Sequence, residues 1–303
     1  MIDRLSEILA PSDNDELQAD VRDLLCWGYD VRRLDESTGH RPLSYIGYLA
    51  LTKLGCVRSL QLDERKLHNF LSAIEHSMPD SNPYHNRVHV SGVVQQMFVQ
   101  LSSIGIDDPL INCACIIAAV VHDCMHPGMT ADAWRALDPT ALPEKTTLEQ
   151  YHLDCALALM TQPANSFLDA VAPETKRDLQ SMVSELVLAT DMTKHGQMMA
   201  HVVRSAREDQ SERHPIWLLQ LLIKVADLHH CMGSTAAHVD WVRNLFSEMQ
   251  GLRADDFPPG FGRCQLQFFD QVVLPMADLL VAIFPVTAPA AQLARANRDC
   301  WLD

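Results

Sequence analysis

Residues 84–89 read Tyr84-His85-Asn86-Arg87-Val88-His89 and lie just after the proline-rich loop 79–83. If His85 and His89 are both helical, their spacing of four places them on one face, about 5 to 6 Å apart. The chain has 14 histidines, so a pair with this spacing arises easily by chance. A metal-binding role for the pair therefore depends on further ligands elsewhere in the chain.

Two aspartates follow long apolar segments and could supply those ligands. The apolar run 113–121 is followed by His122 and then by Asp123. The nearly all-apolar segment 218–226 is followed by Asp227. An ionised carboxylate buried at such a position is costly unless a cation or hydrogen-bond donors stabilise it. A solvated helix end is the alternative for each. Together, two carboxylates and two or three histidines would suit zinc, with magnesium or manganese beside it.

The spacing of apolar residues predicts helices along most of the chain. No sustained alternation of apolar and polar residues is bounded by hairpin turns, so a sheet is not expected. We expect a loosely ordered segment at 1–16 and one compact all-α domain at 17–303, with an irregular loop at 251–264. Helices are expected at 63–78, from Tyr84 through Gln100, at 109–123, from Thr147, and at about 174–192, 194–207, 215–231, 235–250, 265–284 and 289–301.

Composition narrows the choice of partner and compartment. The formal net charge of -15 argues against a nucleic-acid partner, since phosphate-binding proteins carry clustered lysine and arginine. Nine cysteines without a CxxC pair are typical of reduced thiols in a cytosolic protein. The N-terminus lacks the pattern of a secretory signal, and the apolar run 113–121 is shorter than the roughly 20 residues that cross a bilayer. We therefore expect a cytoplasmic location without membrane insertion.

Several polar residues outside these segments have ordinary explanations when taken alone. Glu149 and His152 share a helix face, and Asp191 ends the apolar run 186–190. Gln265 and Phe268 lie three apart on an expected helix. Surface, capping or core positions account for such residues more often than function does, so their significance depends on the whole pattern.

The whole pattern resembles the catalytic domain of the class I cyclic nucleotide phosphodiesterases, which are metal-dependent phosphohydrolases of the HD type. The His-Asp doublet followed much later by a single Asp is the ligand order of HD enzymes. The matching segments extend from about residue 27 to residue 301 in the family's order. They are Trp27-Gly28, Arg41-Pro42-Leu43, Tyr84-His85-Asn86 with His89, His122-Asp123 with His126-Pro127-Gly128, Leu148-Glu149, Leu188-Ala189-Thr190-Asp191-Met192 with Lys194-His195, Ala226-Asp227-Leu228, Trp241, Gln265 with Phe268, and Asn297-Arg298.

The resemblance implies a role for each matching residue. It implies a tighter, zinc-preferring site and a second site for magnesium or manganese, with Asp123 reaching both ions. It makes His85 the general acid. The implied zinc ligands are His89, His122, Asp123 and Asp227; residues near the metal-bound waters are His126, Glu149 and Asp191; residues at the nucleotide are Gln265, Phe268, His230 and Tyr84.

The implied reaction is hydrolysis of cAMP, cGMP or both to the nucleoside 5′-monophosphate. A hydroxide bridging the two ions would attack phosphorus, and His85 would protonate the leaving 3′ oxygen. Two departures from the family pattern concern nucleotide preference. Ala131 replaces an asparagine, and His229-His230-Cys231 replaces Ser-Asn-Pro. The alternatives are a cyclic-nucleotide-sensing module with weak turnover and an HD phosphohydrolase acting on another phosphoester. The sequence does not indicate the preferred purine or the oligomeric state.

Overall fold

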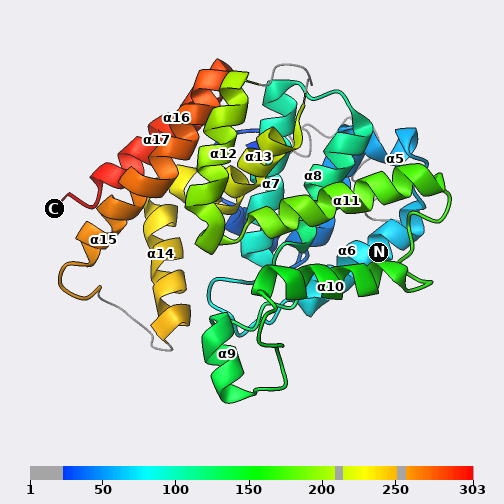
Figure 1. Ribbon diagram of the computed structural model, residues 1–303, viewed down its shortest axis with the longest axis horizontal. Coiled ribbons are helices and arrows are strands. Elements are labelled where there is room, and N and C mark those ends of the chain that lie inside the picture. Colours follow the sequence, from blue (N-terminus) through cyan, green and yellow to red (C-terminus); the bar gives the residue numbers. More distant parts are fainter. Residues whose placement is uncertain (1–22, 209–213, 251–256, 303) are drawn as a thin grey trace.

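The computed structural model describes residues 23–208, 214–250 and 257–302, and within these ranges it contains helices and no strand (Figure 1). The predicted all-α fold is therefore confirmed, while the predicted loose segment 1–16 lies outside the described residues. In chain order the helices are α3 (Arg32–Ser37), α4 (Pro42–Lys53), α5 (Cys56–Ser59), α6 (Glu64–Ser77), α7 (Arg87–Ile104), α8 (Pro109–Val121), α9 (Ala131–Leu137), α10 (Leu148–Thr161), α11 (Pro173–Ala189), η1 (Met192–Lys194), α12 (His195–Glu208), α13 (Ile216–Asp227), η2 (His229–Met232), α14 (Thr235–Gln250), α15 (Phe261–Phe268), η3 (Phe269–Val273), α16 (Leu274–Ile283), η4 (Pro285–Thr287) and α17 (Ala288–Asp299).

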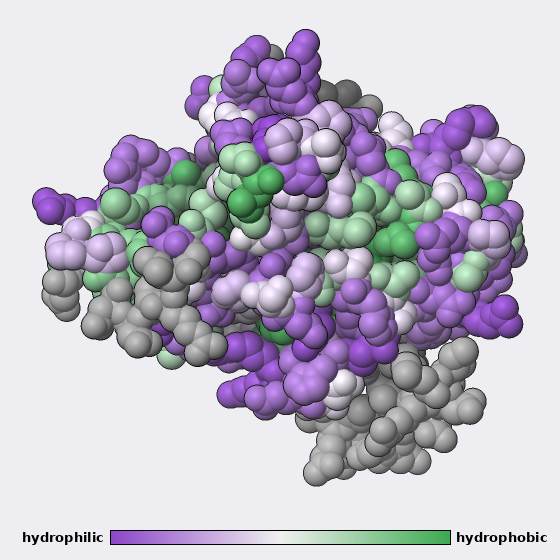
Figure 2. All heavy atoms as spheres, turned by 90° about the horizontal axis from the view of Figure 1, so that it is seen from below, coloured by the Kyte–Doolittle hydropathy of each residue, from purple (hydrophilic) through white to green (hydrophobic). Residues whose placement is uncertain are grey.

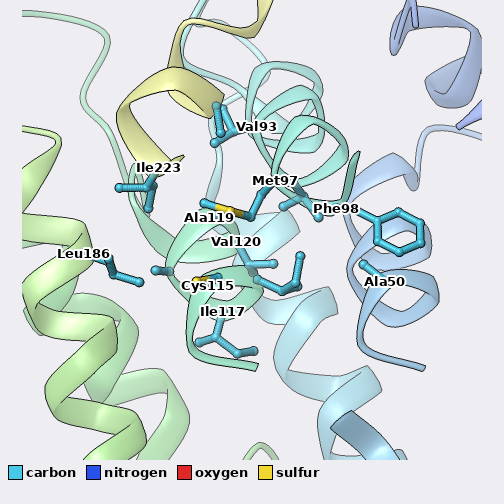
Figure 3. Close-up of a cluster of buried hydrophobic side chains, with 14 of the residues drawn as sticks. Ala50, Val93, Met97, Phe98, Cys115, Ile117, Ala119, Val120, Leu186 and Ile223 are labelled. Carbon is cyan, nitrogen blue, oxygen red and sulfur yellow. The ribbon is translucent and has the colours of Figure 1, made fainter. Parts of the chain in front are cut away.

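The apolar helix α8 lies at the centre of the core. It packs against α4, α7, α11 and α13, and every residue from Asn112 to Val121 is buried. Figure 3 shows side chains from these helices meeting, including Met97 of α7, Leu186 of α11 and Ile223 of α13. Each large apolar side chain buried in this way contributes about 1.5 to 3 kcal/mol. This packing fixes the position of the C-terminal end of α8, which carries His122 and Asp123.

Side-chain caps begin several helices where the sequence places Asp, Asn or Thr. The Asn86 side chain accepts hydrogen bonds from the backbone amides of Val88 and His89 at the start of α7. Asp108 caps α8, and Thr147 caps α10, the helix that was predicted to begin there. Each such cap satisfies backbone amides that have no partner inside the helix. The caps therefore fix where the helices of the core begin.

Some predicted boundaries are wrong. The helix α9 (Ala131–Leu137) is not among the predicted helices, and α15 begins at Phe261 inside the expected loop. The helix predicted at 215–231 stops at Asp227, and residues 229–232 form a 3₁₀ turn. The helix predicted at 265–284 is interrupted by a π-helical turn at Phe269–Val273. His85 is not helical, because Asn86 is the N-cap residue and α7 begins only at Arg87.

The surface and one long helix bear on the question of a membrane. Hydrophilic side chains cover most of the face shown in Figure 2, and hydrophobic ones lie between them in separate patches. Among the described residues, one continuous helical stretch, Phe261–Ile283, is long and apolar enough to cross a membrane by length and composition. One such helix is weak evidence of a membrane span. The apolar run 113–121, which is too short to cross a bilayer, is fully buried in the core.

Candidate active site

Three helix ends bring the four predicted metal ligands together. His89 lies in the first turn of α7, His122 is the C-cap residue of α8 with Asp123 next to it, and Asp227 is the last residue of α13. These three helices pack against one another. Residues up to 138 positions apart in the sequence therefore meet at one point, because each lies at an end of a buried helix: His89 at the start of α7, the others at the ends of α8 and α13.

The distances among these side chains suit ligands that share one ion. Oδ1 of Asp227 lies 3.4 Å from Nε2 of His89 and 3.3 Å from Nε2 of His122. Oδ2 of Asp123 lies 3.5 and 3.2 Å from the same two nitrogens. Two ligands bound tetrahedrally to zinc, each at roughly 2.0 to 2.1 Å, lie about 3.3 Å apart. The arrangement therefore fits a small divalent cation between the four side chains.

The hydrogen bonds of the histidines support the same conclusion. Nδ1 of His122 donates to the carbonyl oxygen of Ala119 at 2.9 Å, so Nε2 is the nitrogen that faces the two aspartates. Although carboxylate oxygens lie nearby, Nε2 of His122 and Nε2 of His89 are buried and neither forms a hydrogen bond of acceptable angle. A histidine that donates through one nitrogen and offers the other to a cation is the usual state of a metal ligand.

Electrostatics keep both aspartates ionised. Burial alone would raise the pKa of Asp227, but His122 and His89 outweigh that effect and lower it. Burial would likewise lower the pKa of His122, yet the charges of Asp123 and Asp227 raise it well above its ordinary value. A cation that binds here takes over the pairing that the imidazolium protons provide, so metal binding releases protons.

Glu248 of α14 holds His85, and sequence reasoning missed it. One carboxylate oxygen pairs with Nδ1 of His85, and the other accepts the backbone amides of Tyr84 and His85 at 2.9 and 3.0 Å. Three contacts to one buried carboxylate fix both the ring and the backbone of His85. Nε2 of His85 is then the nitrogen available to a substrate.

His126 lies face to face with His85, with ring centroids 3.8 Å apart. The backbone amide of Gly128 donates to Nδ1 of His126, so a neutral His126 carries its proton on Nε2. Burial, followed by the charge of His85, lowers the pKa of His126 to about 3. The amide of Asn82 donates to the carbonyl oxygens of both His85 and His126 at 2.9 Å. The stacked pair is therefore fixed from the backbone side as well.

The remaining predicted metal-side residues lie around Asp123. Polar atoms of Asp123, His126 and His152 lie within 4.8 Å of one another. Burial raises the pKa of Glu149, and the charges of Asp191 and Asp123 raise it further. Asp191 is buried, but its pKa is lowered because Lys194 and Thr193 bond to its carboxylate. This acidic side of the site offers oxygen ligands or contacts to water for a second divalent ion.

A cavity of about 280 Å³ adjoins the candidate metal centre and brings the four predicted nucleotide-side residues together. Tyr84, His230, Gln265 and Phe268 line it, together with apolar side chains of α14 and Phe261. The Tyr84 ring lies 4.6 Å from the His89 ring, which connects the cavity to the metal side. An apolar cavity with a few polar groups is the usual form of a site for a small aromatic ligand.

A chain of hydrogen bonds fixes the tautomer of His230. Nε1 of Trp301 donates to Nε2 of His238 at 3.0 Å, so a neutral His238 carries its proton on Nδ1. That nitrogen lies 3.1 Å from Nδ1 of His230, and the two rings are nearly parallel, 7° apart. Burial lowers the pKa of both histidines. His230 therefore accepts from His238 and has only its Nε2–H to offer as a donor.

The fold and the site define an all-helical protein with a candidate divalent-metal centre of two histidines and two aspartates beside an aromatic-lined cavity. The family model described as 3'5'-cyclic nucleotide phosphodiesterase matches residues 84–293, and the chain belongs to that family. Membership of this family implies divalent metal binding, in agreement with the His/Asp cluster.

Curated relatives and solved structures agree with this assignment. The chain is 28% identical over 281 residues to the mouse dual specificity calcium/calmodulin-dependent 3',5'-cyclic nucleotide phosphodiesterase 1C, covering 86% of this chain and 40% of the relative. It is 28% identical over 280 residues to the Drosophila melanogaster high affinity cAMP-specific and IBMX-insensitive 3',5'-cyclic phosphodiesterase 8, covering 86% of this chain and 29% of that protein. The chain thus spans less than half the length of these relatives. The phosphodiesterase domain of the Salpingoeca rosetta rhodopsin phosphodiesterase has the same fold, with a TM-score of 0.80, 22% identity, and coverage of 97% of this chain and 93% of that one.

Proposed function

We propose that this chain hydrolyses 3′,5′-cyclic purine nucleotides to nucleoside 5′-monophosphates. The observation that carries the proposal is the convergence of His89, His122, Asp123 and Asp227 beside both the Glu248-held His85 and the aromatic-lined cavity. Zinc suits the four-residue cluster because it combines two imidazoles with carboxylates. Magnesium or manganese suits the oxygen-rich side of Asp123.

The protein's own residues would orient the substrate and supply a proton. The divalent ions that His89, His122, Asp123 and Asp227 would hold would offset charge on the phosphate and lower the pKa of a bound water. His85 is placed to protonate the leaving 3′ oxygen, and Glu248 holds the imidazole so that Nε2 serves as the donor. Phe268 offers a ring on which the purine stacks, and the Gln265 amide offers a donor and an acceptor to the base edge.

The proposed substrate class follows from the side chains that can hydrogen-bond to the base, which are His230 and Gln265. Adenine and guanine both carry ring-nitrogen acceptors that an Nε2–H donor at His230 could bind. The side-chain amide of Gln265 offers both a donor and an acceptor, and no group among the described residues hydrogen-bonds it and so fixes its orientation. We therefore propose that both cyclic purine nucleotides are substrates, with preference set by how Gln265 is held when the nucleotide is bound.

The proposal is tested by assaying purified protein with cAMP and cGMP, separately, in the presence of zinc and magnesium. His85→Ala should retain its metals and lose turnover by roughly 10² to 10⁴, while Asp227→Ala should lose zinc in metal analysis. Binding of cyclic nucleotides without turnover in the wild type would indicate a sensing module instead. Turnover of other phosphoesters but neither cyclic nucleotide would indicate a different phosphohydrolase.

A further inference from the structure

Lys224 is a buried lysine in an otherwise apolar segment of α13. Lys224 is only 2% exposed. Its neighbours in α13, from Leu221 to Ala226, are buried apolar residues. Burying an ammonium group is costly unless hydrogen bonds and charges compensate. Such a residue needs a structural reason, and it lies one helical turn before the metal-side residue Asp227.

The ammonium group binds the C-terminal end of another helix. Nζ donates to the carbonyl oxygens of Ala189, Thr190 and Asp191 at 3.0, 3.2 and 3.4 Å. The last carbonyls of a helix have no partner inside it and lie at the negative end of its dipole. The ammonium group carries three protons for these carbonyls, and Sδ of Met192 lies 3.5 Å from Nζ as a further, weaker acceptor. Lys224 therefore caps α11 from the neighbouring helix α13.

The capped turn is the one that carries Asp191. On the other side of that turn, the Asp191 carboxylate accepts from the amide and hydroxyl of Thr193 at 2.9 and 2.6 Å. Its second oxygen lies 2.8 Å from Nζ of Lys194. Lys224 holds the peptide groups and Thr193 holds the carboxylate, so the orientation of Asp191 is set from both sides.

Lys224 also acts on the acidic residues of the site through its charge. Burial lowers its pKa, while the charges of Asp227, Asp191 and Glu149 raise it. These three acids come from three different segments: the end of α13, the turn after α11 and the first turn of α10. A single buried cation therefore offsets repulsion among carboxylates that would otherwise push one another apart.

We propose that Lys224 is a positioning residue of the metal centre, which aligns Asp191 and Asp227 for the ions by capping α11. This inference rests on the proposed metal-dependent function, but it assigns a role to a residue that contacts neither metal nor substrate. A purely structural lysine would change the stability of the fold and leave the zinc affinity of the folded protein unchanged.

The test is zinc affinity, measured by chelator competition on Lys224→Met, which keeps an unbranched side chain one heavy atom shorter and removes the ammonium group. We expect affinity to fall about 10- to 100-fold, as for other groups that orient metal ligands. Leu218→Ala is the matched control, since it truncates a buried side chain in the same helix, about two and a half turns before Asp227, and should bind zinc as the wild type does. Amide hydrogen exchange at 189–194 should also accelerate in Lys224→Met and not in Leu218→Ala.

Several results would overturn the inference. Wild-type zinc affinity in Lys224→Met would do so, as would equal loss in Leu218→Ala. Tighter zinc binding in Lys224→Met would also contradict it, because the substitution would then have removed only the repulsion between the Lys224 ammonium group and the zinc ion. If Lys224→Met does not fold, Lys224→Gln, which keeps two of the donors, should bind zinc more weakly than the wild type, and unchanged affinity would count against the inference. A wild type that binds no zinc would instead contradict the proposed function.

Discussion

Glu248 illustrates how one buried carboxylate can couple stability to pH. Its pKa lies below the ordinary value of 4.5, because the contacts with His85 and with two backbone amides outweigh the effect of burial. A folded-state pKa below the unfolded value means that the ionised group stabilises the fold above about pH 4.5. That contribution is lost as pH falls through the folded-state pKa.

We predict that Glu248→Gln lowers the free energy of unfolding at pH 7 by about 1.5 to 3 kcal/mol, the range for a hydrogen bond to a charged group. The difference between wild type and variant should shrink as the pH is lowered below about 4.5, the ordinary value for a glutamate. Urea unfolding of both proteins from pH 7 down to about pH 3 measures how this difference in the free energy of unfolding depends on pH. A difference that stays constant with pH would mean that Glu248 is not ionised in the fold.

At the residue level, the candidate metal ligands that follow apolar runs were predictable from the sequence, whereas the residue that orients His85 was not. His122, Asp123 and Asp227 stand out because a charged or polar residue ends a buried helix. Glu248 does not, since an acid in the last turns of an amphipathic helix looks like a surface residue. Only the fold shows that this face of α14 turns toward His85.

The departures at 229–231 also have a structural explanation that the sequence alone did not give. Gly92, one turn after His89 on α7, makes room for the ring of His229, because a Cβ atom at residue 92 would lie 2.4 Å from Cε1 of His229. His230 is held by His238, eight residues later, and through it by Trp301 at the end of the chain. Pairings over such separations leave no periodic signal in the sequence.

At the level of elements, the start of α7 links helix formation to the site. We predict that Asn86→Ala lowers the free energy of unfolding by about 0.5 to 2 kcal/mol, because the amides of Val88 and His89 lose their acceptor. It should also weaken zinc binding, since His89 lies in that first turn. Thermal unfolding and chelator competition measure the two effects.

The control for this prediction is Asp63→Ala, which removes the corresponding cap from α6. It should cost a similar amount of stability and leave zinc affinity unchanged, because α6 contributes none of the four candidate ligands. Equal zinc affinity in both variants would show that the cap of α7 does not position His89.

The π-helical turn at Phe269–Val273 separates two helical segments with different tasks. α16 packs Met276, Ala277 and Leu280 into the core, while α15 presents Gln265 and Phe268 to the cavity. A π turn contains one residue more than an α turn, so it rotates the segment before it relative to the segment after it. Such turns are frequent at functional sites for this reason.

We predict that deleting the exposed residue Gln271 restores regular α-helix and rotates α15 by about 100° relative to α16. Gln265 and Phe268 would then leave the cavity. Cyclic nucleotide binding, measured by calorimetry in the presence of metal, should fall sharply, while zinc content stays at the wild-type level. The substitution Gln271→Ala is the control and should bind normally. Normal binding by the deletion variant would contradict the role of the π turn.

Helix α6 was predictable because its apolar residues recur every three to four positions, and α8 because it is one continuous apolar run. The π turn was not, because its extra residue shifts the apolar pattern too little to be seen over one turn. The helix α9 was missed because it is seven residues long and has no buried residue. Its formation depends on the Thr130 cap rather than on an apolar face.

At the scale of the whole molecule, the fold gathers negative charge around the candidate metal centre, where helices α8, α10, α11 and α13 begin or end. The chain has 39 acidic and 24 basic residues, and Asp123, Asp191, Asp227 and Glu149 lie on one side of the core. Repulsion among such groups destabilises a compact state, and bound cations relieve it. The metal centre is therefore expected to stabilise the fold as well as to serve the reaction.

We predict that removal of metal by a chelator lowers the melting temperature of the wild type and that added zinc restores it. A ligand present at 100 times its dissociation constant stabilises the folded state by about 2.7 kcal/mol. Asp227→Ala, which lacks one of the four ligands, should melt at nearly the same temperature with and without the chelator, whereas Asp63→Ala should respond as the wild type does. Calorimetric scans of the three proteins make the comparison. A wild type whose melting temperature does not change with the chelator would mean that the four side chains converge without holding a cation.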